Sequence, residues 1–183
     1  MAAQKRKDPT WKDVKTVLVN LDQKQLLKLI ADLYKFSNEN KTFLNTRFSV
    51  GKDQLGPYKK VIEECLFPDV LRDKPVEIAK AKKAISRYSK AAGDDQGQAE
   101  LMVYFVECGN RFTLNIGDMY QEFYDALNSM YQRAINKVLS LPANQQREFK
   151  RRLKEIMTSS SDIGWGYHET LAYDYFRAFP EDK

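Results

Sequence analysis

Apolar residues recur at three- and four-residue steps along most of the chain, which is the spacing of one face of an α-helix. The clearest run occupies residues 118–141, DMYQEFYDALNSMYQRAINKVLSL. Asp118 is a predicted N-cap, and Pro142 ends this helix or begins the next. The apolar positions of the run are Met119, Phe123, Ala126, Leu127, Met130, Ala134, Val138 and Leu141. We therefore expect one long amphipathic helix here.

Shorter segments with the same period precede it. Residues 11–21 form a short apolar segment, and residues 23–36 form a predicted helix that Asp22 caps. The next helix is expected to begin at Asn38 and to end at Gly51. The first part of the chain is therefore predicted to be mostly helical.

Prolines and glycines divide the remaining segments. One helix is expected to start near Pro57 and stop at Pro68, and another to be opened by Pro75 and ended by Gly93. Two further helices are expected, one after Pro142 with Phe149, Leu153 and Ile156 as its core face, and one over 167–179.

Residues 98–110 allow two interpretations, because ELMVYFVECG is apolar on nearly every side. The segment is either a fully buried helix or a core strand followed by a hairpin turn at 108–111. We favour a central helix that packs on the 118–141 helix, since all neighbouring segments read as helical.

These elements predict an all-α fold of about seven helices, arranged as a single-domain bundle or a short α-solenoid-like array. The domain is expected to span 11–183, after a flexible basic N-terminus at 1–10.

Composition agrees with a globular protein. The chain has 183 residues, of which 43% are hydrophobic and 30% charged, and its net charge is +5. The longest apolar run, 101–106, is far shorter than the roughly 20 residues of a bilayer span, and no secretory signal is apparent. Cys65 and Cys108 lie too far apart to indicate a disulfide scaffold. We expect a cytoplasmic protein with two free, buried thiols.

Four stretches resemble, in this order, a bacterial family of small proteins of unknown function. They are LDQKQLLKLIADLYKFSNENKTFL, IAKAKKAISRYSKAAGD, ELMVYFVECGNRFTLNIGDMYQEFYDALNSMY and GWGYHETL. The resemblance covers roughly residues 21–171 and implies a mostly helical single domain. It implies no activity and no site residues.

No reaction centre is apparent in the sequence, and we expect no catalytic residues, cofactor or metal. The single histidine, His168, has no paired base beside it. Both cysteines lie in apolar surroundings, which raise a thiol pKa. Asp118, Glu122 and Asp125 share a helix face but lack matching ligands, so we interpret Asp118 as a cap and Glu122 as complementing the helix dipole. An enzyme whose site is assembled from Glu122, Asp125, His168 and a tyrosine is the least favoured hypothesis.

Two rows of basic residues are candidate anion- or nucleic-acid-binding surfaces. The rows comprise Lys80, Lys83, Arg87 and Lys90 on one predicted helix, and Arg147, Lys150, Arg151 and Lys154 on another. Side by side they would straddle a phosphate backbone. Acids within and beside the rows, such as Glu148 and Glu155, would reduce this charge, and solvated helix faces are the alternative reading.

Tyrosine-rich helix margins are the candidate partner-binding surface. The residues concerned are Tyr120, Tyr124, Tyr131, Trp165, Tyr167, Tyr173 and Tyr175. Tyrosine suits a protein interface and the rim of a core equally well.

By elimination, the leading hypothesis is a non-enzymatic protein-interaction module whose partner is another protein. The alternative is a nucleic-acid-binding accessory protein that uses the basic rows. No membrane partner is expected, and the oligomeric state is left open.

Overall fold

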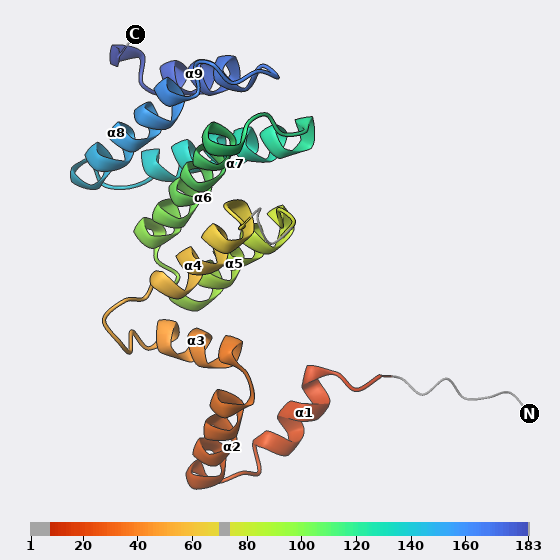
Figure 1. Ribbon diagram of the computed structural model, residues 1–183. Helices are drawn as coiled ribbons and strands as arrows, with labels where there is room; N and C mark the ends of the chain where they lie inside the picture. Colours follow the sequence, from red (N-terminus) through yellow and green to blue (C-terminus); the bar gives the residue numbers. More distant parts are fainter. Residues whose placement is uncertain (1–7, 70–73, 183) are drawn as a thin grey trace, which may run out of the picture. The chain divides into compact units, whose positions relative to one another are not determined.

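The computed structural model describes residues 8–69 and 74–182, and all regular structure in these ranges is helical (Figure 1). The all-α prediction is confirmed, although the described residues form nine α-helices and not about seven. The chain divides into two compact units, one ending at Leu44 and the other beginning at Asn45. A single domain over 11–183 stays a prediction, and most of the expected flexible N-terminus lies outside the described residues.

The first unit contains α1 (Trp11–Leu18), α2 (Gln23–Phe36) and most of α3 (Asn38–Arg47). The α1 helix lies in the range 11–21, for which the sequence indicated only a short apolar segment. Its start is fixed by a capping box, in which the Thr10 N–H donates to Asp13 Oδ2 at 2.7 Å. Asp22 caps α2 as predicted, accepting from the Gln25 N–H at 2.7 Å.

The second unit contains α4 (Gly56–Leu66), α5 (Ile78–Ala92), α6 (Asp95–Ile116), α7 (Gln121–Leu139), α8 (Ala143–Ser159), α9 (Tyr167–Ala178) and the short 3₁₀ helix η2 (Pro180–Asp182). The α6 helix packs against α4, α5, α7 and α8 (Figure 1). Residues 98–110 lie within α6, so the favoured interpretation as a helix is confirmed and the hairpin alternative is wrong.

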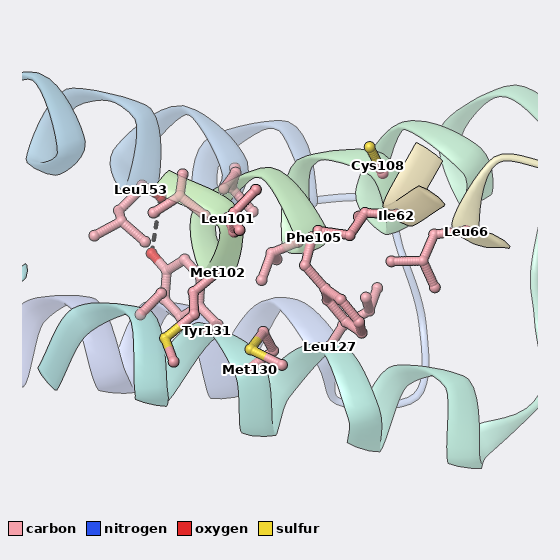
Figure 2. Close-up of a cluster of buried hydrophobic side chains, with 14 of the residues drawn as sticks. Ile62, Leu66, Leu101, Met102, Phe105, Cys108, Leu127, Met130, Tyr131 and Leu153 are labelled. Atoms are coloured by element: carbon pink, nitrogen blue, oxygen red, sulfur yellow. Dashed lines mark hydrogen bonds between the residues drawn. The ribbon is translucent and has the colours of Figure 1, made fainter. Parts of the chain in front are cut away.

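The core of this unit surrounds α6. Leu101 and Phe105 of α6 are fully buried, and Leu127 of α7 is 1% exposed (Figure 2). The α8 helix joins the same core, since the Tyr131 hydroxyl donates to the Leu153 carbonyl at 2.8 Å (Figure 2). The helix has neighbours on most sides, which explains why its polar side is only a narrow stripe with Glu100, Glu107 and Arg111.

Gly109 is a close-packing residue and not the turn residue that the hairpin reading required. A Cβ at Gly109 would lie 2.9 Å from Leu127 Cδ1 and closer still to Cδ2, well inside van der Waals contact. The missing side chain therefore lets α6 and α7 approach each other.

Several predicted boundaries are shifted. Asp118 does not cap α7, which begins at Gln121 with Tyr120 at the N-cap position. Pro75 does not open α5, which begins at Ile78. The α3 helix ends at Arg47, before Gly51. Gly93 does end α5, in the left-handed region at φ 65°, as its lack of a Cβ allows.

A largely buried ion network ties α8 to α6 and α4. The Arg152 guanidinium forms a two-pronged pair with Glu107, with both N–O distances 2.7 Å, and also pairs with Glu100. Lys59 of α4 pairs with the other Glu100 oxygen at 2.6 Å. Burial acts to raise the pKa of Glu100, but the hydrogen bonds from Arg152 and Lys59 outweigh it, so this pKa is lowered.

Replacing Arg152 by alanine should lower the free energy of unfolding by about 3 kcal/mol, because Glu107 would lose its partner and Glu100 would keep only Lys59. Urea denaturation followed by circular dichroism measures this. Arg151→Ala is the matched control, since Arg151 is exposed and pairs only at the surface. Equal effects of the two substitutions would contradict a structural role for the Arg152 network.

Gly109→Ala should also destabilise the protein, by about 1–2 kcal/mol. Alanine is the better helix former, but overpacking against the buried Leu127 outweighs that gain. The control is Gly164→Ala, because a Cβ at Gly164 meets no atom within 4 Å. An unfolding midpoint that rises in Gly109→Ala would show that α6 and α7 have room to separate.

Candidate functional site

The two predicted basic rows lie on helices that both pack against α6. The first row is on α5, which packs against α4 and α6, and the second is on α8, which packs against α6, α7 and α9 (Figure 1). A shared neighbour does not place the two rows side by side, so the helix packing gives no support to the hypothesis of two adjacent ridges.

In the first row, Lys80 pairs with Glu77 at 3.0 Å.

Acids neutralise most of the second row. Lys150 pairs with Glu181 at 2.5 Å and with Asp182 at 2.9 Å. Lys154 also reaches Asp182, and Arg151 pairs with Glu148 and Glu155 of its own helix. These pairs leave little net positive charge on the α8 face. Arg147 is the member for which no pair with a described residue is seen.

Asp182 holds the C-terminal 3₁₀ helix against α8 and α9. Its carboxylate accepts a hydrogen bond from the Tyr175 hydroxyl at 2.5 Å and a second from Lys150. These two bonds lower the pKa of Asp182 to about 2. Because the folded-state pKa is depressed, this carboxylate stabilises the fold above its ordinary pKa and the contribution is lost as the pH falls from about 4 to 2.

Asp182→Asn should therefore reduce the thermal unfolding midpoint at pH 6. The difference from the wild-type chain should shrink between pH 4 and pH 2, where the wild-type carboxyl also becomes protonated. Differential scanning calorimetry at closely spaced pH values provides the measurement. A difference that is constant from pH 6 to pH 2 would rule out the proposed carboxylate contact.

Four of the seven proposed partner-binding aromatic residues are core residues. Tyr124, Tyr131, Tyr167 and Tyr175 are at most 1% exposed. Tyr124, for example, shares a 2.7 Å hydrogen bond with Thr113, and its ring lies 5.2 Å from that of Tyr167. Such side chains cannot contact a partner of the folded domain.

The other three aromatic residues of that set are accessible. Tyr120 is 47%, Trp165 58% and Tyr173 66% exposed. The sequence pattern does not separate these from the buried tyrosines, because both kinds lie beside apolar helix positions.

The residues considered for catalysis have structural contacts. His168 Nδ1 lies 3.0 Å from the Met157 carbonyl oxygen and 3.1 Å from the Ser160 hydroxyl. Cys65 and Cys108 are buried, and burial raises the pKa of Cys108 to about 12. Within the described ranges, no three His, Cys, Asp or Glu side chains converge as a metal site requires, and this includes Asp118, Glu122 and Asp125.

The structure brings together a basic pocket that the sequence analysis missed. It lies between α5 and α7 over α6 and has a volume of about 290 Å³. Its charged side chains are Lys82 and Lys90 of α5 and Arg133 of α7, and Ser86 and Ser89 supply hydroxyl groups. Only Lys90 belonged to a predicted row, because the other two cations come from separate positions that share no sequence pattern.

The first unit presents a different surface. Neither α1 nor α2 buries a single residue. The large apolar side chains that the unit leaves exposed are Trp11, Val14, Val17, Val19, Leu27, Leu29, Ile30, Leu33, Phe36 and Phe43. We name this set the apolar N-terminal residues. They do not share a single face, since they are spread over the helices of the unit and Leu27 lies toward the lysine side of α2. The periodicity of 23–36 predicted one apolar side of a helix, but not that this side would stay exposed within the unit.

None of the helices in the described ranges combines the length and apolar character that a bilayer crossing requires. A family model described as a family of unknown function (DUF6155) matches residues 10–176. No curated protein and no solved structure shows significant similarity to the chain. The resemblance to a family of unknown function is thus confirmed, whereas a bacterial source and a cytoplasmic location stay predictions.

Proposed function

The chain belongs to the family of unknown function DUF6155, and we propose from its geometry that it acts by binding another protein and not by catalysis. The observation that carries this proposal is the exposed apolar side of α2, which presents Leu29, Ile30, Leu33 and Phe36. Exposed apolar patches of several neighbouring side chains mark interaction sites.

The apolar side of α2 has the spacing of a helix-pairing seam. Leu26, Leu29, Leu33 and Phe36 follow one another at steps of three, four and three residues. This is the heptad spacing with which one helix packs along another. The partner we propose is therefore an α-helix, or a groove between helices, with an apolar stripe of its own.

The lysines of α2 lie away from this seam. At 100° per residue, Lys24, Lys28 and Lys35 fall together on the opposite side of the helix. A partner that covered the seam would leave these ammonium groups in water. Docking would therefore require no desolvation of an ammonium group.

The gain from covering this surface is large enough for specific binding. Burying a Leu, Ile or Phe side chain contributes about 1.5–3 kcal/mol. A stable interface needs about 800 Å² from each partner. Leu29, Ile30, Leu33 and Phe36 on one side of α2 contribute on the order of 100 Å² each, about half of that area. The exposed side of α1, with Trp11, Val14 and Val17, can contribute on the order of 300 Å² more.

The nucleic-acid alternative draws less support, since Lys150, Arg151 and Lys154 of the α8 row are already paired with acids. The enzyme alternative would use His168, whose ring contacts Ser160 and the Met157 backbone. Binding through the N-terminal helices, in contrast, uses apolar side chains that the unit leaves exposed.

Site-specific photocrosslinking tests the proposal. Leu33 and Lys24 are nine residues apart, so they lie on opposite sides of α2. A benzophenone amino acid at Leu33, in the full chain inside its native cells, should give an intermolecular adduct that the same group at Lys24 does not give. The purified partner should then bind the wild-type chain at least tenfold more tightly than Ile30→Asp, whereas Lys28→Asp should change affinity less than threefold.

The mass of the adduct identifies the partner as a second copy or as another protein. Two results would overturn the proposal. One is equal adduct formation from Leu33 and Lys24. The other is crosslinking from Leu33 that stays entirely within a single chain.

A further inference from the structure

We propose that the basic pocket between α5 and α7 binds the dianionic phosphate group of a small phosphorylated molecule. Its recognition groups are Lys82, Lys90 and Arg133, together with Ser86, Ser89 and Gln98. This inference is independent of protein binding through the N-terminal helices, because it concerns another set of residues.

Every charged side chain that lines the pocket is cationic. Among the described residues, Lys82, Lys90 and Arg133 form no ion pair with an acid, whereas Lys59, Lys137, Lys150 and Arg152 do. Asp95, close in sequence to Gln98, is already paired with Lys137 at 2.8 Å. Three unpaired cations in one hollow create a local positive potential that an anion would relieve.

The uncharged groups of the pocket suit a ligand that only accepts hydrogen bonds. The Gln98 amide nitrogen donates to the Ser89 hydroxyl oxygen at 3.2 Å. The Ser89 hydroxyl proton is therefore directed elsewhere and is available to an acceptor. A phosphate dianion offers acceptor oxygens alone, and charge-assisted bonds from Lys and Arg to such oxygens are strong.

The shape of the pocket favours one small ligand over a polynucleotide. Its volume of about 290 Å³ lies just below the range of about 300–1,000 Å³ for small-molecule sites, so it suits a small ligand. The three cations come from two helices and line one hollow, whereas a nucleic-acid backbone is bound by cations spread along its length. Ile85 and Met130 also line the pocket but are at most 2% exposed, so its accessible surface comes mainly from the charged and polar side chains.

Isothermal titration calorimetry of the full chain with inorganic phosphate, at ionic strength held constant with chloride, tests the site. Arg133→Gln and Lys82→Gln should each raise the phosphate Kd at least tenfold. Arg147→Gln removes the same charge from α8, outside the pocket, and should change the Kd less than twofold. Arg133 is exposed and Lys82 half-buried, so unchanged thermal midpoints without phosphate will show that the variants are folded.

A pH series separates dianion recognition from general charge attraction. Phosphate gains its second negative charge near neutral pH and a phosphomonoester near pH 6, whereas sulfate is a dianion throughout. Phosphate affinity should therefore rise between pH 5.5 and 7.5, while sulfate affinity stays constant. A nucleoside monophosphate should bind at least as tightly as inorganic phosphate and compete with it.

Three results would overturn the proposal. The first is the absence of binding heat with phosphate up to 50 mM. A Kd above that concentration would be on the order of a hundred times weaker than a typical metabolite site requires. The second is an equal loss of affinity in Arg147→Gln and the pocket variants. The third is a single-stranded oligonucleotide that binds more tightly than the monophosphate with a steep salt dependence, which would assign the pocket to a polymer.

Discussion

Burial of α6 is the constraint on which the second unit depends. A 22-residue helix with apolar side chains on nearly every side is stable in water only when other helices enclose it, and α4, α5, α7 and α8 do so. Glu100 and Glu107 interrupt this apolar surface, and Arg152 pairs with both. The α6 helix thus determines its neighbours by hydrophobic packing and also by two carboxylates that need a cationic partner.

Much of this architecture follows from the sequence. Helical periodicity indicated α2, α6 and α7, and local capping chemistry placed Asp22 and Gly93 correctly. Errors arose where tertiary contacts decide between local options. Asp118 has the residue type of a helix cap. In the structure, however, the Met119 N–H before α7 donates to the Tyr124 hydroxyl oxygen at 3.1 Å. The α1 helix was missed although its Thr10–Asp13 capping box is a local signal.

The functional surfaces were less predictable for a related reason. Periodicity tells which residues share a helix face, but not whether another element covers that face. It could not distinguish the buried Tyr131 from the exposed Tyr173, nor show that Lys82 and Arg133 line one pocket. It also could not show that acids from η2 would reach the lysines of α8.

The acids of η2 matter for handling the protein. Glu181 and Asp182 carry the charges opposite Lys150 and Lys154. Proteolytic cleavage on the N-terminal side of Glu181 would remove both acids and turn a nearly neutral helix face into a cationic one. Cleaved material would adhere to heparin or contaminating RNA and give the impression of a nucleic-acid-binding protein. Intact mass should therefore be verified before any polyanion affinity is attributed to this chain.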